Sequence, residues 1–281
     1  MVEDMSASDR WVIPASVLRR IPGCAGGKAP LRVQLLHGGR SVNRNLRIDT
    51  RVGRFVLRQR IWEGPRPGAD PLREVACHRA AAAAGVAPAV PDAAPDGRWI
   101  LMDYVEGRMW TPPRLQAPEG LRTLGACLQR LHAITPSKGL AVFDPVSIAT
   151  GQAEAILERD PAAAAHVNAL VARTRQLAVD CAAFAVTPVT THGDLNARNL
   201  IGPVPMLVDW EYAQLADPVY DLACLSVYYP GLRLRGGELL SAAGITDANG
   251  AARLRLHAQL FDSLNRLWKQ AEAFATGIAQ L

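Results

Sequence analysis

Alternating apolar and polar positions run through residues 31–62. The segments LRVQLL, NLRID and RFVLRQ alternate and carry β-forming residues, and the turn-prone stretches HGGRS and TRVG separate them. Because successive side chains of a strand point to opposite faces, the pattern predicts three strands that share one buried face. The shortness of the turns favours an antiparallel meander.

A helix is predicted next. Asp70 is a suitable N-cap, Pro71 fits the first helical position, and EVACHRAAAAAG runs on alanines to a stop at Gly85. The segment RWILMDY, between DG and EG, predicts a further strand. From about residue 117 onward the apolar spacing of three and four predicts a mainly helical remainder, interrupted by a strand–turn–strand in NLIGPVPMLVDWEY.

This order of elements predicts an α+β fold of two lobes. Residues 1–102 would form a small β-rich lobe, and residues 103–281 a larger, mainly helical lobe. With 49% hydrophobic residues in 281, the chain can bury a substantial core. A cleft between the lobes would be the natural ligand site.

Charge and cysteine content narrow the function classes. The 31 Lys and Arg exceed the 26 Asp and Glu by five, without a run of five like charges, so we expect no nucleic-acid partner. The five cysteines form no Cys-x-x-Cys pair, which argues against a zinc knuckle or a disulfide framework. With no signal-peptide pattern and no apolar run of ~20 residues, we expect a cytoplasmic protein without a membrane span.

The segment THGDLNARNLIGPVPMLVDWE concentrates the candidate chemistry: it contains His192, Asp194, Asn199, Asp209 and Glu211. If residues 199–201 pair with 206–209 around a turn, Asn199 lies opposite Asp209, with Cβ atoms ~5 Å apart. Two oxygen-bearing side chains at that separation could bind one Mg²⁺. Asp194, on the preceding loop, could then orient a hydroxyl nucleophile.

The spacing H-x-D-x-x-x-x-N, followed ten residues later by Asp, resembles the catalytic loop and metal-binding Asp of the protein-kinase-like fold. The form HGDLNARN with VDWEY is more similar to the aminoglycoside phosphotransferase, choline kinase and thiamine kinase group than to protein kinases. The resemblance extends from about Gly38 to Leu225. It implies a bilobal kinase-like fold, ATP and Mg²⁺ as cofactors, and phosphoryl transfer to an alcohol.

The resemblance also implies roles for the residues of this segment. Asp194 would accept a hydrogen bond from the acceptor hydroxyl, and alignment would matter more than strong basicity. Asn199 and Asp209 would bind Mg²⁺. His192, and Asp221 in DPVYDLA, would brace the loop.

On the nucleotide side, the resemblance implies that Arg58 holds the α- and β-phosphates of ATP, with Glu74 as its ion-pair partner. Aminoglycoside kinases use Lys at this position, whereas choline- and thiamine-kinase-like proteins often have Arg, which can bind two oxygens at once. Val56, on the same strand face, would cover the adenine. The alternative is that Arg58 is an exposed strand residue and Glu74 a helix-surface charge.

Two backbone stretches complete the expected nucleotide site. LHGGRSVNRN, which includes Ser41, resembles the nucleotide-covering loop but lacks the full G-x-G-x-x-G. WILMDYVEG resembles the hinge, in which the carbonyl of Asp103 and the N–H of Val105 would bind the adenine edge.

Acceptor binding is assigned to Glu211, Tyr212 and Trp268. Aromatic residues gather in the last third of the chain, where they either form the core or supply the cation–π contacts that a quaternary ammonium or thiazolium group would use. Tyr212 resembles a choline-contacting position of choline kinases. Glu211 could instead support the metal site from behind or cap a following helix.

The predicted function is ATP- and Mg²⁺-dependent phosphorylation of a small-molecule alcohol, with an amino alcohol such as choline or ethanolamine, or a thiamine-like cation, as favoured acceptor. The same-family alternative is an aminoglycoside or sugar kinase, although the C-terminal segment RLWKQAEAFATGIAQL has one Glu against Arg266 and Lys269. An alternative of another class is a catalytically silent nucleotide-binding protein.

Overall fold

The computed structural model describes residues 13–36, 43–61, 66–136 and 140–275. The chain divides into two compact units, the first made of Met1–Trp62, Val90–Ala94 and Arg98–Tyr104 and the second of Glu63–Ala89, Pro95–Gly97 and Val105–Leu281. The division is not a single cut in the sequence, because residues 63–89 belong to the second unit. The lobe boundary at residues 102–103 stays a prediction.

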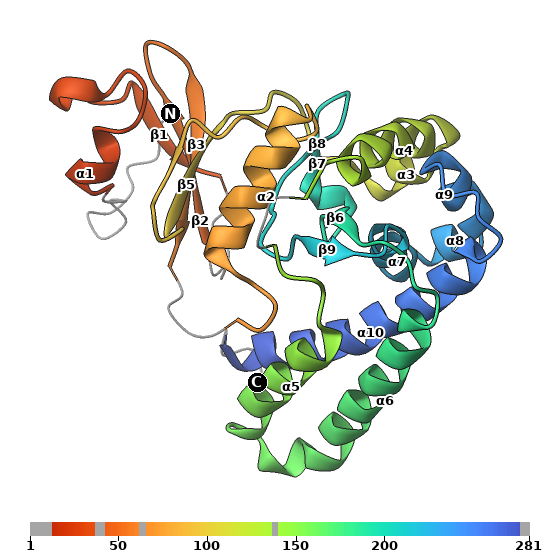
Figure 1. Ribbon diagram of the computed structural model, residues 1–281. Helices are drawn as coiled ribbons and strands as arrows, with labels where there is room; N and C mark the ends of the chain where they lie inside the picture. Colours follow the sequence, from red (N-terminus) through yellow and green to blue (C-terminus); the bar gives the residue numbers. More distant parts are fainter. Residues whose placement is uncertain (1–12, 37–42, 62–65, 137–139, 276–281) are drawn as a thin grey trace. The chain divides into compact units, whose positions relative to one another are not determined.

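The first unit is built on a five-stranded antiparallel sheet in the order β1-β2-β3-β5-β4 (Figure 1). The three strands predicted from residues 31–62 are confirmed as β1–β3, and the strand predicted around residue 100 as β5. The strands are β1 (Arg32–Leu35), β2 (Asn43–Asp49), β3 (Arg54–Arg60), β4 (Asp92–Ala93) and β5 (Trp99–Asp103).

The alternation of these strands sorts the two faces of the sheet. Leu46 and Ile48 of β2 and Leu57 of β3 are fully buried, and they pack with Ile21 and Cys24 of the segment that follows helix α1 (Ala15–Leu18). A short 3₁₀ helix, η2 (Ala25–Gly27), leads from there to β1. The opposite face carries polar and basic positions such as Arg47.

Helix α2 (Pro71–Ala83), in the second unit, begins as predicted. The Asp70 carboxylate accepts hydrogen bonds from the backbone N–H groups of Leu72, at 2.9 Å, and Arg73, at 3.1 Å. These contacts satisfy two of the N–H groups that lack partners at a helix start. Gly85, with φ of 69°, follows the end of the helix in the left-handed conformation that glycine tolerates best.

The rest of the second unit is mainly helical, and its long C-terminal helix α10 packs against α5, α6 and α7 (Figure 1). None of the helices in the described ranges is both long and apolar enough to cross a membrane. The helices are α3 (Pro112–Gln116), α4 (Pro118–His132), α5 (Pro145–Leu157), η3 (Pro161–Ala163), α6 (Ala164–Ala182), η4 (Ala197–Asn199), α7 (Val219–Tyr228), α8 (Pro230–Arg233), α9 (Gly236–Ala242) and α10 (Gly250–Ala275).

Two small antiparallel ribbons interrupt these helices: β6 (Val189–Thr191) pairs with β9 (Gln214–Ala216), and β7 (Leu200–Ile201) pairs with β8 (Met206–Leu207). The second ribbon confirms the predicted strand–turn–strand but corrects its register. Leu200 pairs with Leu207, so Asn199 lies opposite Val208, whose N–H donates to the Asn199 carbonyl at 3.0 Å.

The predicted pairing of Asn199 with Asp209 is therefore wrong by one residue. Two local features cause the shift. Asn196 caps the 3₁₀ turn η4 by accepting from the Arg198 N–H at 3.0 Å, which takes Asn199 out of the strand. Asp209 leaves the ladder with φ of 71°, a left-handed conformation that few residues other than glycine adopt. A one-residue shift reverses which face each side chain occupies, so the two groups reach the site from irregular backbone instead of from paired strands.

Candidate active site

The backbone of the loop that carries Asp194 is hydrogen-bonded to Asp221 of α7, and the Asp221 side chain is fully buried. Its carboxylate accepts hydrogen bonds from the N–H groups of His192, at 3.1 Å, and Gly193, at 3.0 Å, and pairs with His132 Nε2 at 2.9 Å. Gly193 has φ of 80°, and a Cβ there would clash with the carbonyl oxygen of Tyr212. The loop can therefore follow this path only with glycine beside the aspartate.

The side chain of His192 ties the same loop to the ribbon β7–β8. Its Nε2 donates to the carbonyl of Val208 at 2.9 Å, and its ring packs 4.9 Å from that of Trp210. A nitrogen engaged in this way is not available to move protons in the cavity. The geometry therefore places His192 and Asp221 where a bracing role requires them.

Asp194 is held by one side chain far from it in the sequence, Tyr228, and by two asparagines of its own loop. The Tyr228 hydroxyl donates to Asp194 Oδ1 at 2.6 Å, and Asn196 Nδ2 lies 3.4 Å from Oδ2. Asn199 Nδ2 donates to the Asp194 backbone carbonyl at 2.9 Å. In the sequence, Tyr228 is distinguished only as one of the aromatic residues in the last third of the chain. The signal that could have selected it is its position about two helical turns after Asp221, on the same face of α7.

The pKa of the Asp194 carboxyl lies near neutral pH. Burial and, after it, the negative charges of Asp209 and Glu211 raise the pKa of Asp194 to about 7, against hydrogen bonds from Tyr228 and Asn199 that lower it. Three carboxylates thus crowd one region, and a positive charge placed among them would stabilise the ionised form of Asp194. Strongly shifted carboxyls of this kind are typical of functional sites.

The donor set fits Mg²⁺. Asn199 donates its Nδ2 to the Asp194 carbonyl, so its Oδ1 is the atom that could bind a metal, and Asp209 contributes a carboxylate at the wall of the same cavity as Asp194. That both bind one Mg²⁺ stays a prediction. Amide and carboxylate oxygens are the ligands that this hard cation prefers. No three His, Cys, Asp or Glu side chains of the described ranges form a metal-binding group by themselves. An ion held here would complete its shell with phosphate oxygens and water.

A cavity of about 200 Å³ opens beside Asp194 within the second unit. Asp209 and Glu211 contribute further carboxylates to its wall. The remaining wall is rich in aromatic rings, and Tyr228 meets Phe261 edge to face at 5.4 Å. The aromatic lining consists of Phe143, Tyr212, Tyr220, Tyr228, Phe261 and Trp268. A cavity with both carboxylates and aromatic faces suits an organic cation.

Arg66 brings to this site a positive charge that was not predicted from the sequence. Its Nη1 lies 2.7 Å from Glu211 Oε2, and its Nη2 donates to the Tyr212 hydroxyl at 3.3 Å. Burial would lower the pKa of Arg66, but Tyr212, Glu211 and other acidic neighbours outweigh it and raise the pKa above its usual value. Trp268 Nε1 also donates to the Tyr212 hydroxyl, at 2.8 Å, so the predicted acceptor residues Glu211, Tyr212 and Trp268 form one network.

The structure decides one of the two alternatives for Glu211, and its support of the metal site stays a prediction. The strand β9 follows it, so the interpretation of Glu211 as a helix cap is wrong. Its side chain is paired with Arg66, and both side chains are only 9% exposed. Arg66 lies in a Gly- and Pro-rich segment without periodicity, so no pattern in the sequence indicated a role for it.

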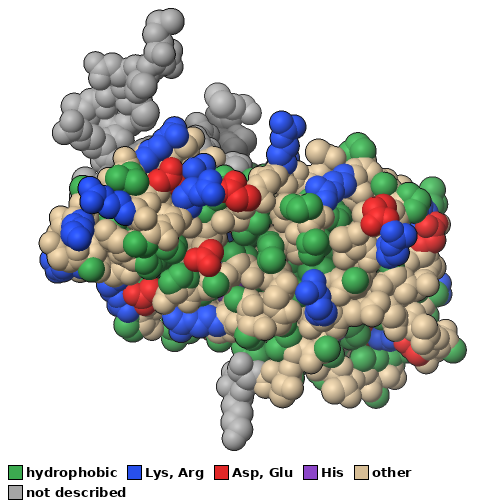
Figure 2. All heavy atoms as spheres, turned by 90° about the horizontal axis from the view of Figure 1, so that it is seen from above, with side chains coloured by type: hydrophobic (Ala, Val, Ile, Leu, Met, Phe, Trp, Pro, Cys, Tyr) green, Lys and Arg blue, Asp and Glu red, His purple; other side chains and the backbone are tan. Residues whose placement is uncertain are grey.

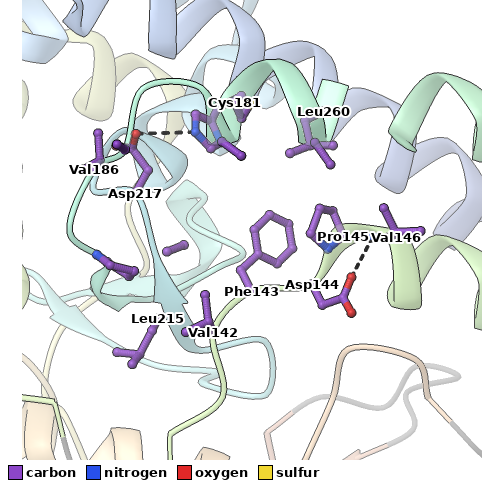
Figure 3. Close-up of a pocket in the computed structure, with 16 residues that line it drawn as sticks. Val142, Phe143, Asp144, Pro145, Val146, Cys181, Val186, Leu215, Asp217 and Leu260 are labelled. Carbon is purple, nitrogen blue, oxygen red and sulfur yellow. Dashed lines mark hydrogen bonds and ion pairs between the residues drawn. The ribbon is translucent and has the colours of Figure 1, made fainter. Parts of the chain in front are cut away.

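A second cavity of about 440 Å³ lies elsewhere in this unit and carries none of the residues predicted for the site (Figure 3). Its wall is mostly apolar, with Val142, Val186, Leu215 and Leu260 among the labelled side chains. Its carboxylates are already engaged. Asp144 caps α5 through the Val146 N–H at 3.1 Å, and Asp217 pairs with Arg253 at 2.6 Å. The smaller cavity, next to Asp194, is therefore the candidate active site.

The residues predicted to bind the nucleotide are divided between the two units. Val56 and Arg58 lie on β3 and Asp103 ends β5 in the first unit, whereas Glu74 and Val105 belong to the second. Arg58 is 6% exposed and Glu74 3% exposed, which contradicts the alternative that both are surface charges. Their pairing and the adenine contacts stay predictions. Ser41 lies outside the described residues.

Comparison with known proteins identifies the family. Residues 32–257 match the model of the phosphotransferase enzyme family, APH. The chain belongs to this family. The match covers the sheet of the first unit, the Asp194 loop and the start of α10. No curated protein matches the chain.

Solved structures of APH-type and choline-kinase-type proteins share the fold. A choline/ethanolamine kinase family protein from Mesorhizobium loti is 24% identical, with 90% of this chain and 83% of that chain covered and a TM-score of 0.66. Choline kinase LicA from Streptococcus pneumoniae is 17% identical, with 92% and 91% covered and a TM-score of 0.72. Macrolide 2′-phosphotransferase MphH from Brachybacterium faecium is 20% identical, with 88% and 87% covered and a TM-score of 0.56. The expected kinase-like α+β fold is thereby confirmed.

Proposed function

We propose that this APH-family protein transfers the γ-phosphoryl group of ATP to the hydroxyl of a small cationic alcohol, with an amino alcohol or a thiamine-like molecule as the favoured acceptor. The observation that carries the proposal is Asp194. This carboxyl is held by Tyr228 at 2.6 Å and lies at the wall of a cavity lined by carboxylates and aromatic rings.

Nucleotide use is supported by the family and by the complexes of two structural neighbours. LicA has been crystallised with AMP, and aminoglycoside phosphotransferase APH(4)-Ia with ADP and hygromycin B. For this chain, we propose that Arg58 binds the α- and β-phosphates and Glu74 orients it. A guanidinium can bind two phosphate oxygens at once, which suits it to this position.

In the proposed reaction, Asp194 orients the acceptor hydroxyl by accepting its hydrogen bond. The hydroxyl oxygen forms a bond to the γ-phosphorus, the bond to the β–γ bridging oxygen breaks, and ADP leaves. The hydroxyl proton passes to the Asp194 carboxylate. Mg²⁺ held by Asn199 and Asp209 would neutralise charge on the transferred group. Tyr228 and the backbone contacts of Asp221 fix the direction in which the carboxylate points, and such alignment supplies much of the catalysis in phosphoryl transfer.

The cavity chemistry supports a cationic acceptor. Asp194, Asp209 and Glu211 provide negative charge, and Arg66 neutralises only part of it. The rings of Tyr228, Phe261 and Trp268 provide the π faces that quaternary ammonium groups bind. A neutral sugar could hydrogen-bond the carboxylates, but it would gain neither the charge attraction nor the cation–π contact that a cation gains from the same groups.

The decisive experiment is an ATP-consumption screen of choline, ethanolamine, thiamine, amino sugars and aminoglycosides with Mg²⁺, using Asp194→Asn as the blank. We expect Asp194-dependent turnover of a singly charged alcohol. Turnover confined to aminoglycosides would support the same-family alternative. Nucleotide binding without turnover of any acceptor would support the silent nucleotide-binding protein.

A further inference from the structure

The positive charge of the chain is concentrated in the first unit. Its residues include thirteen Lys and Arg against six Asp and Glu, a net charge of +7, whereas the second unit has eighteen against twenty, a net charge of −2. The overall excess of five therefore hides a strongly basic sheet unit and a slightly acidic helical one. Blue Lys and Arg side chains gather in the view of Figure 2, among green apolar ones.

Part of this charge lies at one end of the sheet, in a surface that we call the basic tip: Lys28, Leu31, Arg32, Arg51, Val52 and Arg54. Two segments form it. The turn between β2 and β3 is closed by the Thr50 N–H, which donates to the Gly53 carbonyl at 2.9 Å. The start of β1 lies beside that turn, because the Leu31 N–H donates to the Asp49 carbonyl at 2.8 Å.

All six residues of the basic tip are exposed. Leu31 is 65% exposed and Val52 66%, so each presents most of an apolar side chain to solvent among the cations. Asp49, which is paired across the sheet with Arg32 and Arg54, is half-buried and hydrogen-bonded to Arg47 at 2.7 Å. The pKa of Asp49 is lowered chiefly by that bond and also by the charges of Arg32 and Arg54, its partners on the two neighbouring strands.

We propose that the basic tip docks this protein on the surface of an anionic lipid bilayer. Clustered Lys and Arg bind the negative surface potential, and the two apolar side chains enter the boundary between headgroups and acyl chains. Charge complementarity selects the anionic surface, and the paired exposure of Leu31 and Val52 selects a bilayer over a purely polar partner.

A nucleic acid would use the same charges but different neighbours. Proteins that bind single strands stack bases on exposed aromatic rings, and none of the six residues of the basic tip is aromatic. Exposed leucine and valine would gain little against a phosphate backbone. The apolar pair therefore provides the discriminating test.

The experiment is vesicle flotation of the full chain at low and physiological salt. One set of vesicles contains phosphatidylcholine alone, and the other also contains about a third phosphatidylglycerol. We compare Lys28→Gln/Arg51→Gln and Leu31→Ser/Val52→Ser with the wild type. The matched control is Arg175→Gln/Arg255→Gln, which removes the same charge from exposed positions of α6 and α10.

We expect binding to the anionic vesicles only. The charge pair should weaken it about fivefold for each cation, and the apolar pair about tenfold, with the control unchanged. The apolar loss should persist at higher salt, whereas the loss from the charge pair should shrink because screening weakens the wild type too. The proposal fails if the wild type does not float, if the control weakens binding as much as the tip variants do, or if the Leu31→Ser/Val52→Ser variant floats as well as the wild type, which is the result expected for a purely polar partner such as a nucleic acid.

Discussion

Replacing Asp194 with Asn should reduce turnover while making the folded protein more stable at alkaline pH. The substitution keeps the size of the side chain and an oxygen that can accept from the Tyr228 hydroxyl. It removes the charge that burial and the neighbouring Asp209 and Glu211 disfavour. Because Asp194 destabilises the fold but is needed for the proposed reaction, the substitution should raise stability while it lowers turnover.

The magnitude follows from the pKa. Burial, with the nearby carboxylates, raises the pKa of Asp194 to about 7 from the usual 3.8. Below pH 3.8 both folded and unfolded chains hold the proton, so the wild type has its full stability there. As pH rises toward 7 only the folded chain holds it, and stability falls by about 1.4 kcal/mol per pH unit. Between pH 3.8 and 7 the loss adds up to about 4 kcal/mol, and this is an upper bound for the gain in folding stability that Asp194→Asn gives at pH 8.

The assay is urea unfolding at pH 5 and pH 8, without nucleotide or Mg²⁺, paired with steady-state kinetics. The stability advantage of Asp194→Asn should be larger at pH 8, and kcat should fall by roughly a hundredfold or more with nucleotide binding retained. Asp180→Asn, on α6 and outside the cavity, is the control. An advantage that is equal at both pH values would refute the account of the buried charge, and undiminished turnover would refute the role of Asp194.

Four further substitutions test the surrounding groups. Tyr228→Phe removes the bond that lowers the pKa of Asp194, so the acidic limb of the pH profile of kcat/KM should move to higher pH; an unmoved limb would mean that Tyr228 only packs. Asp209→Ala should abolish Mg²⁺-dependent turnover, and activity retained at saturating Mg²⁺ would exclude it as a ligand. Arg66→Met leaves Glu211 buried without its partner and should destabilise the fold by about 3 kcal/mol in urea unfolding, a loss that Arg66→Met/Glu211→Gln should partly reverse. Arg58→Ala should chiefly raise the KM for ATP, and an unchanged KM would place Arg58 elsewhere.

The elements that the sequence predicted are those with a local cause. The strands β1–β3 follow from alternation over a few residues, and α2 begins where Asp70 can accept the N–H groups of the next turn. The irregular backbone around Asn199 and Asp209 was harder to predict. The cap at Asn196, three residues before Asn199, and the left-handed Asp209 shifted the register, and neither leaves a periodic pattern.

The side-chain pairs that shape the cavity have causes far along the chain. Arg66 and Glu211 are 145 residues apart, and Tyr228 lies 34 residues after Asp194. No spacing rule connects such positions, because the tertiary fold alone decides which side chains meet. The motif selected the residues proposed to react, but it could not give the charge balance around them.

That charge balance also bears on the order of events in the proposed reaction. Because Asp194 has a pKa of about 7 in the cavity alone, a large share of it is protonated at neutral pH and cannot accept a proton from the acceptor. A positive charge brought near Asp209 and Glu211 weakens their repulsion and lowers the pKa of Asp194. A cationic acceptor would therefore help to ionise the carboxylate that activates it, whereas a neutral alcohol of the same shape would not. Choline and its uncharged carbon isostere, 3,3-dimethylbutan-1-ol, separate these cases: the acidic limb of the kcat profile should lie at lower pH for choline. Coincident limbs would show that the charge of the acceptor does not reach Asp194.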